Sequence, residues 1–471
     1  MGNSPSALQQ CIEAVGNGRT GFAGFPGSPL IYQLAWVQPY NLDITLTPAA
    51  VVRPETAEDI SGVIKCAAAN NVKVQAKSGG HSYGNYGLGG VDGAVSIDLV
   101  HFQQFSMDNS TWQATIGAGT RLGQVSERLH QAGGRATSFG VCPGVGIGGH
   151  STIGGLGPMS RMWGSSLDHV VEVEVVTADG AIQRANSSLN SDLFWTLKGA
   201  ASSFGVITEF VVRTHAEPGN IVQYDYSVAF GSQAEIAPFY SAWQDLITNP
   251  ALDRRFGSTF IMMPLGALIS GTFYGTDAEF QASGIPDSLP KGSGVHIEMT
   301  DWLASLANGA QKEAMYLTDM PAPFYSKSLG FRREDLPPAD KIRDVFQWVD
   351  EQNKGTPLWF IIFHDSGGAV GDVPENATSY AHRDKILYYQ SYAVGIPLAQ
   401  ESKDFVTNFH QQVQTTCAPT AYGTYPGYVD PALPEAQQQY WGSNLPRLQA
   451  LKKMLDPADL FHNPQSIKGA E

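Results

Sequence analysis

The sequence predicts an α+β protein made of two parts, and three observations support this class. The chain has 471 residues, about three times the usual length of one domain. Strand-like and helix-like segments alternate along it. Near residue 213 the composition changes, because glycine becomes rarer while aromatic residues and prolines become more frequent. Hydrophobic residues make up 42% of the chain, which is enough for a large core, so disorder is not expected.

Local patterns predict the individual elements. Alternating apolar residues indicate strands at residues 49–53, 72–76, 95–100, 112–116 and 171–175. Thr56 and Asp59 form a capping pattern ahead of apolar residues at helical spacing, so a helix is expected from there to Ala68. An Ala-Asp-Gly turn at 178–180 predicts a hairpin. Further helices are expected at residues 122–129, 398–414 and 445–454.

Charge and cysteine content exclude several classes of protein. The net charge is −15 and no basic run occurs, so we expect no nucleic-acid partner. No apolar stretch reaches the roughly 18 residues that cross a bilayer, so we expect no membrane segment. The four cysteines lack metal-site spacing, so no metal is expected. The low charge and the sequons at Asn109, Asn186 and Asn376 favour a secreted protein.

Glycine is concentrated in two short segments. The chain has 51 glycines, and fourteen of them lie in residues 79–90 and 140–157. Both segments expose a run of backbone N–H groups without side chains, which suits the approach of a pyrophosphate. Each also contains one distinctive residue, His81 in the first and Cys142 in the second. An isolated histidine of this kind usually caps a turn, and an isolated cysteine is usually a small buried apolar residue.

Two familiar motifs occur in these segments without their normal context. Gly80 to Gly84 match G-x-S-x-G around Ser82, but four glycines in residues 84–90 exclude the helix that a hydrolase nucleophile elbow requires. Gly144 to Gly149 match G-x-G-x-x-G, with Asp168 about twenty residues further on. In a dinucleotide fold a buried parallel strand ends just before the first glycine of this motif, but here Pro143 occupies that position, which a buried strand does not tolerate. We therefore expect neither a serine hydrolase nor a nicotinamide enzyme.

Three segments of the chain match a known family: AKSGGHSYGNYG, then GVCPGVGIGGHSTIGGLGPMSRMWGSSLDHVVEVEVVTADG, and YWGSNLPRLQALKKMLDP with the final FHNPQSI. In these segments the chain resembles the berberine bridge enzyme-like branch of the vanillyl-alcohol oxidase flavoproteins. The gluco-oligosaccharide and chito-oligosaccharide oxidases are the most similar members. The resemblance covers residues 45–467. It implies an FAD-binding part from residues 1–213 and 420–471, and an antiparallel-sheet substrate domain, covered by helices, from residues 214–419.

The resemblance also implies FAD attached at two points. His81 matches the histidine joined to the 8α-methyl group of the flavin, and Cys142 matches the cysteine joined to the neighbouring ring carbon. Val206 matches a position whose main chain contacts the adenine side of the cofactor. Val145 matches a position at which a small aliphatic residue lets oxygen reach the flavin. The remaining matches are to backbone that holds the cofactor: Lys77, Ser78, Gly79, Gly80, Ser82, Gly144, Gly146, Gly148, Gly149 and His150.

The other cysteines follow from the same resemblance. Cys11 and Cys66 match the family's N-terminal disulfide, which leaves Cys417 as a buried thiol. We expect a monomer.

The catalytic residues are expected near Tyr428. Tyr425 and Tyr428 match the Y-x-x-Y of the sugar oxidases, in which the second tyrosine takes the hydroxyl proton while hydride leaves for the flavin. A free tyrosine has a pKa of about 10, so its surroundings must help it to act as a base. Tyr83 matches a sugar-stacking position, and Tyr425 is expected to contact substrate as well.

The sequence departs from the family pattern in two places. The N-Y-x-D motif reads Gly427-Tyr428-Val429-Asp430, without the asparagine. In the sugar oxidases a carboxylate on the strand before a glycine pair supports the catalytic tyrosine. In this chain that strand precedes Gly367 and Gly368, and counting along it places His364, rather than Asp365, at the position of the carboxylate.

The expected function is an FAD-linked oxidase that acts on an alcohol, first of all the anomeric hydroxyl of an oligosaccharide, with O2 as acceptor and H2O2 as product. Two alternatives stay open. One is an oxidase or dehydrogenase of a non-carbohydrate alcohol. The other is a flavin-carrying binding protein with little turnover.

Overall fold

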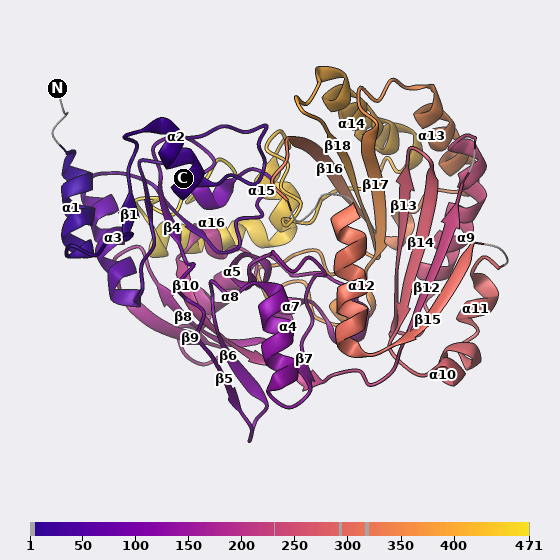
Figure 1. Cartoon of the computed structure of the whole chain (residues 1–471), viewed down its shortest axis with the longest axis horizontal. Helices are drawn as coiled ribbons and strands as arrows, with labels where there is room; N and C mark the ends of the chain where they lie inside the picture. The colour runs from indigo at the N-terminus through magenta and orange to yellow at the C-terminus, as the bar shows by residue number, and fades with distance from the viewer. Residues whose placement is uncertain (1–4, 230, 292–293, 316–319, 471) are drawn as a thin grey trace.

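The computed structural model describes residues 5–229, 231–291, 294–315 and 320–470, and it contains the expected mixture of helices and strands (Figure 1). Two smaller sheets from the first half of the chain lie on one side of the molecule. A large sheet from residues 221–394 lies on the other side. The C-terminal segment returns to the first side, so the two ends of the chain belong to the same half (Figure 1).

The first sheet has four strands in the order β1-β2-β4-β3. The strands are β1 (Ala23–Gly24), β2 (Ala50–Val52), β3 (Val74–Lys77) and β4 (Val95–Asp98). Helix α3 (Ala57–Ala69) joins β2 to β3, and Thr56 and Asp59 form its capping box as expected. Helix α1 (Ala7–Gly16) packs on α3. Because β3 ends at Lys77, the first glycine loop begins directly at the carboxyl end of a buried strand.

The second sheet has five antiparallel strands in the order β5-β6-β10-β8-β9. They are β5 (Phe105–Asp108), β6 (Gln113–Gly117), β8 (Val170–Val176), β9 (Ile182–Asn186) and β10 (Val206–Arg213). The expected hairpin is present, because Val176 pairs with Ile182. The second glycine loop lies between α4 (Leu122–Gln131) and β8. The helices between the start of this loop and β8 are single turns, namely α5 (Ile147–His150) within the loop, and α6 (Ser160–Trp163) and α7 (Ser166–His169) after it.

The large sheet has seven antiparallel strands in the order β15-β12-β14-β13-β17-β18-β16. Their bounds are β12 (Ile221–Val228), β13 (Phe256–Met263), β14 (Gly266–Phe273), β15 (Val295–Thr300), β16 (Phe324–Phe331), β17 (Leu358–Asp365) and β18 (Leu387–Val394). Period-two alternation puts one set of side chains toward the helices and the other set toward the first half of the molecule.

Helices cover the outer face of this sheet, and a further helix stands on its inner side. The outer helices are α9 (Ala237–Ile247), α13 (Ala339–Glu351) and α14 (Gln400–Gln412), and the last of these confirms the helix expected at 398–414. Helix α12 (Trp302–Met315) stands between the sheet and the N-terminal half (Figure 1). The short helices α10 (Asp277–Ala282) and α11 (Ile285–Ser288) lie at the lower edge.

The two largest hydrophobic clusters among the described residues follow this arrangement. One core takes most of its residues from the first 221 positions and from 433–467, including Leu448 and Phe461 of the C-terminal segment. Helices α15 (Ala436–Trp441) and α16 (Leu445–Leu455) belong to it, and α16 matches the predicted final helix. The other core takes its residues from positions 222–421. The exact division at 213/214 and 419/420 stays a prediction.

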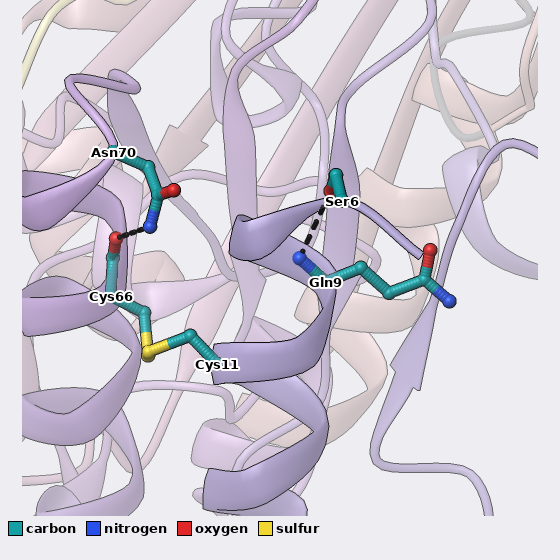
Figure 2. Close-up of a disulfide and its surroundings, with 5 residues drawn as sticks. All are labelled: Ser6, Gln9, Cys11, Cys66 and Asn70. Atoms are coloured by element: carbon teal, nitrogen blue, oxygen red, sulfur yellow. Dashed lines mark hydrogen bonds between the residues drawn. A yellow bond between two sulfur atoms is a disulfide. The ribbon is translucent and has the colours of Figure 1, made fainter. Parts of the chain in front are cut away.

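A disulfide joins α1 to α3. Cys11 and Cys66 are bonded with a Cα–Cα distance of 5.7 Å, as the resemblance implied. Figure 2 shows the bond between the two helices, beside the hydrogen bond from Asn70 Nδ2 to the carbonyl oxygen of Cys66 at 2.8 Å. The Ser6 hydroxyl caps α1 by accepting from the backbone N–H of Gln9. Cys142 and Cys417 are the cysteines outside the disulfide, and Cys417 is only partly buried.

Candidate active site

A cavity of about 470 Å³ lies between the two glycine loops and the seven-stranded sheet. Both loops contribute to its wall, together with the inner face of the sheet and residues 425–429. This volume is within the range of small-molecule sites, about 300–1,000 Å³. The cavity is therefore the candidate active site.

The two glycine loops touch each other through their backbones. A Cβ atom added to Gly79 would overlap the backbone of residues 144–146, and one added to Gly146 would overlap Gly79 N and Ser78 Oγ. The Ser78 hydroxyl donates to the carbonyl oxygen of Ala118 at 2.6 Å. Gly80 has a φ of +80°, which side-chain-bearing residues rarely adopt. Glycine is thus required here for close approach and for one left-handed backbone position.

His81 and Cys142 both line the cavity. The ring of His81 lies against Tyr40, with centroids 4.5 Å apart. Cys142 is partly buried in the second loop. The structure therefore brings the two predicted attachment residues to the wall of one cavity.

Most of the other predicted cofactor residues also line the cavity. They are Lys77, Ser78, Gly79, Gly80, Ser82, Val145, Gly146, Gly149 and His150. Gly144, Gly148 and Val206 are not among the lining residues. The first two pack against the opposite loop and Ala118, while Val206 is fully buried at the start of β10. The cofactor role of all these residues stays a prediction.

His150 holds the second loop in shape. Its Nε2 accepts a hydrogen bond from the backbone N–H of Gly140 at 3.0 Å. Burial lowers the pKa of His150 to about 4, so the ring is neutral at pH 7 and can act as this acceptor.

The two rejected motifs, G-x-S-x-G around Ser82 and G-x-G-x-x-G at Gly144–Gly149, each require a helix directly after them. After Ser82 the chain forms only a 3₁₀ turn at Tyr86–Leu88, not the helix of a nucleophile elbow. After the second motif the helix is the single turn Ile147–His150. Neither motif is therefore followed directly by a helix longer than one turn.

Tyr428 and His364 form the polar centre of the cavity. The Tyr428 hydroxyl lies 3.1 Å from Nε2 of His364, which is on β17. Burial lowers the pKa of His364 to about 4, so the imidazole is neutral at pH 7. Tyr83 stacks on Tyr428 with ring centroids 6.3 Å apart.

Asp365, the neighbouring candidate, has a different partner. Its Oδ2 lies 3.5 Å from Nε of Arg161, and both side chains are almost fully buried. Burial raises the pKa of Asp365 to about 6, although Arg161 opposes this shift. Neighbouring strand residues point to opposite faces. This is why His364, and not Asp365, contacts Tyr428.

Tyr425 and Tyr83 both line the cavity, and both have hydroxyl groups bonded within the protein. The backbone N–H of Gly155 donates to the Tyr425 hydroxyl at 2.8 Å, and burial raises the pKa of this tyrosine to about 12. The Tyr83 hydroxyl bonds that of Tyr392. The substrate contacts of Tyr83 and Tyr425 stay predictions.

The sequence analysis missed several residues of the cavity wall. Tyr40 comes from an irregular segment, and Gln390 and Tyr392 lie two positions apart on β18. Strand periodicity could have shown that Gln390 and Tyr392 face the same side of the sheet. It could not have shown that this side is the inner face. Tyr86 and Tyr274 also line the cavity.

These residues fit a flavin dinucleotide. The contacting glycines leave backbone N–H groups beside the cavity, as a pyrophosphate requires. Among the described side chains, the buried Tyr86 hydroxyl lines the cavity and has no hydrogen-bond partner in the protein, so it suits a polar group of a ligand. An imidazole and a thiol are present for covalent attachment. The fold and the site thus define a flavin-binding oxidoreductase.

Comparisons with known proteins identify the family. Residues 48–186 match the family described as FAD binding domain, and residues 424–468 match the one described as berberine and berberine like. The FAD-linked oxidoreductase sorD of Penicillium rubens is 38% identical over 469 residues, covering 98% of each chain. The chain therefore belongs to the berberine bridge enzyme-like family and is an FAD-dependent oxidoreductase.

Solved structures agree with this assignment. The xylooligosaccharide oxidase of Myceliophthora thermophila C1 in complex with xylobiose has a TM-score of 0.90 and 31% identity, covering 99% of this chain and 100% of the other. A structure concerned with the 6-S-cysteinyl, 8α-N1-histidyl FAD of the glucooligosaccharide oxidase from Acremonium strictum has a TM-score of 0.88 and 29% identity, covering 99% and 100%. The expected fold class and class of enzyme are confirmed.

Membrane spans and metal clusters are both absent from the described residues. None of their helices combines the length and apolarity needed to cross a membrane. No group of three or more histidine, cysteine, aspartate or glutamate side chains among them could hold a metal ion.

Proposed function

We propose that the protein is an oxidase that removes hydride from an alcohol and passes the electrons to O2, giving H2O2. The observation that carries this proposal is the position of the Tyr428 hydroxyl. It lies 3.1 Å from a neutral imidazole, in the same cavity that His81 and Cys142 line. A proton acceptor and the two predicted attachment residues therefore share one cavity.

Tyr428 acts as the base in this proposal. With its own proton on Nδ1, the neutral His364 presents a lone pair at Nε2 and accepts the hydroxyl hydrogen of Tyr428. The tyrosine oxygen then has lone pairs directed at the substrate hydroxyl. As the substrate proton moves to Tyr428, the phenolic proton moves to His364, so the tyrosine stays neutral and the positive charge passes to the imidazole.

FAD supplies the hydride acceptor when it is bound. His81 and Cys142 would hold it covalently, and the packing of His81 on Tyr40 fixes the imidazole in the cavity wall. The 6-S-cysteinyl, 8α-N1-histidyl FAD of the Acremonium strictum enzyme supports this double attachment. Val145, a small residue in the cavity wall, would leave space for oxygen.

Two substrate classes are candidates. Oligosaccharides, oxidised at the anomeric hydroxyl, are the first class to test, because the similar structures include a xylooligosaccharide oxidase and a glucooligosaccharide oxidase. A non-carbohydrate alcohol is the second class. It is favoured by His364, because a neutral imidazole stands at the position where the resemblance to the sugar oxidases implies a carboxylate.

We also propose a secreted monomer with a three-segment domain arrangement. The Cys11–Cys66 disulfide supports an oxidising compartment. The separation of the two cores supports an FAD-binding part from 1–213 and 420–471 around a substrate domain of 214–419.

The test measures anaerobic bleaching of the flavin and aerobic release of peroxide with sugars and with other alcohols. The expected result is bleaching by at least one alcohol, with one H2O2 formed for each carbonyl product. Bleaching without reoxidation by air would instead identify a dehydrogenase. A flavin that no alcohol bleaches would identify a flavin-carrying binding protein.

A further inference from the structure

The inner face of the large sheet carries a row of aliphatic side chains next to the catalytic pair. Leu268 on β14 pairs with Ile261 on β13, which pairs with Ile362 on β17. All three line the cavity. Ile362 precedes His364 by two positions and therefore faces the same side. We call Leu268, Ile261 and Ile362 the aliphatic row.

The aliphatic row offers no hydrogen-bonding atoms to a ligand. Directly opposed side chains in antiparallel strands lie about 4.5–5.5 Å apart at Cβ, so the three form one continuous apolar strip. Ile261 and Ile362 are each 5% exposed. They pack in one cluster with Tyr40, Phe360 and Tyr392. A ligand at this wall therefore meets aliphatic and aromatic carbon.

The polar atoms around the aliphatic row are largely bonded to one another. The Tyr392 hydroxyl donates to Gln390 Oε1 at 2.9 Å and also bonds the Tyr83 hydroxyl. Gln390 is the strand neighbour of Ile362. On the other side of the row, the Ser270 hydroxyl donates to Asp225 at 2.7 Å and accepts from Lys312 at 3.0 Å. The oxygen atoms named here and the Lys312 ammonium group already have partners within the protein.

A sugar ring would bury several hydroxyl groups at this wall. Each buried hydroxyl needs a hydrogen-bond partner, and leaving one without a partner is unfavourable. An aryl or alkyl group has no such requirement and gains from leaving water. The composition of this wall therefore favours an apolar substituent over a ring that carries hydroxyl groups.

We propose that the substrate is an alcohol with an aryl or alkyl group next to its carbinol carbon, and that the aliphatic row holds this group. This inference rests on the proposed oxidase function. The carbinol C–H bond breaks with its electron pair leaving as hydride to the flavin. The O–H proton goes to Tyr428, and the product is the aldehyde or ketone. O2 takes up two electrons and two protons to give H2O2.

The experiment compares cinnamyl alcohol, benzyl alcohol and 1-octanol with glucose, cellobiose and xylobiose on the holoenzyme. Anaerobic flavin reduction is followed against concentration, which separates the dissociation constant from the limiting reduction rate. We expect at least one apolar alcohol to have a ratio of limiting reduction rate to dissociation constant that is about ten-fold higher than that of every sugar. A sugar that exceeds all three apolar alcohols overturns the inference but leaves the oxidase intact.

The variant Ile362→Gln tests the aliphatic row itself. It should raise the dissociation constant for the preferred apolar alcohol about ten-fold, with a small change in the limiting reduction rate, because loss of apolar contact in a pocket has effects of this size. The control is Leu358→Gln, on the same strand and the same face but at an exposed end. It should match the wild type.

Three results would overturn the inference. The first is equal affinity of Ile362→Gln and wild type for the apolar alcohol, in a variant with unchanged melting temperature and flavin spectrum. The second is an equal loss of affinity in Leu358→Gln. The third is a flavin that no alcohol reduces, which would remove the proposed oxidase and this inference together.

Discussion

The two glycine loops and the inner face of the seven-stranded sheet form opposite walls of the same cavity, but they are built differently. The loops form their wall largely from backbone, and Gly79 and Gly146 are fixed by the contact between the loops. The sheet forms its wall from side chains, whose position depends on strand register. A backbone wall suits a cofactor shared by a family, whereas a side-chain wall can change with the substrate.

The largest expected effect concerns the loop wall. The double variant His81→Ala, Cys142→Ala should lose all covalently held FAD, because no nucleophile then remains at either attachment position. Denaturation followed by filtration, with intact mass, measures this as flavin released and about one FAD of mass lost. Cys417→Ser is the matched control. Burial raises the pKa of Cys417 to about 12, so its thiol is unreactive. Wild-type protein that already releases its flavin would contradict the double attachment.

The next effect concerns the sheet wall. Tyr428→Phe should lower the limiting rate of flavin reduction by about 10²–10⁴-fold, the usual contribution of a general base. The flavin spectrum and the melting temperature should not change. Tyr422→Phe, in the same segment but exposed, serves as control. A reduction rate that survives in Tyr428→Phe would assign the proton to another group.

A smaller effect tests the close contact between the loops. Gly79→Ala places a methyl group against the backbone of residues 144–146, where neither side can move without shifting a loop. We expect a loss of about 1–3 kcal/mol in the free energy of unfolding, as for other overpacked sites, together with reduced flavin content. Gly219→Ala has open space around it and should stay within about 0.5 kcal/mol of wild type. For both variants, urea unfolding measures the free energy of unfolding, and the ratio of flavin to protein absorbance measures the flavin content.

The smallest effect is a dependence on pH. His364 has a pKa of about 4 in the folded protein, below its ordinary value of 6.5, because it is buried. As pH falls through about 4, Nε2 gains a proton and can no longer accept from Tyr428. The reduction rate at pH 3 should therefore be about ten-fold below its plateau.

His364→Gln should remove this acidic limb, because an amide does not titrate in this range. Stability is affected separately. Between pH 6.5 and 4 the unfolded state binds more protons at His364 than the folded state, so its contribution to stability falls as pH decreases through this window. Melting temperatures measured at each pH separate unfolding from loss of the proton acceptor. If the reduction rate of His364→Gln still falls at acidic pH as in the wild type, the fall is due to the protonation of another group. Asp365, whose pKa is raised to about 6, is one such group.

The sequence is most informative where local chemistry determines structure. Thr56 and Asp59 predict the start of α3 because their side chains cap its first turn. The glycine clusters predict the loop wall of the cavity because only glycine permits the contact between the two loops. Matching the strand to the family pattern predicts His364 rather than Asp365 beside the tyrosine, and strand alternation then allows only one of the two neighbours to face it.

The rest depends on contacts between distant segments. Tyr40 reaches His81 from an irregular segment, and nothing in its local sequence indicates this. The aliphatic row exists only because Leu268, Ile261 and Ile362 are in register across three strands. No local pattern distinguishes these residues from ordinary core residues.

The return of the C-terminal segment to the first half of the molecule has a consequence for the order of events during synthesis. Leu448, Phe461 and Ile467 fill the first core, and the backbone N–H of Val74 donates to the carbonyl oxygen of Leu460. Asn463, Gln465 and Ser466 line the cavity itself. Chains begin to fold from the N-terminus as they emerge from the ribosome. Here the wall of the cavity is incomplete until residues 463–466 have been made, so a chain that stops before them lacks part of the candidate active site.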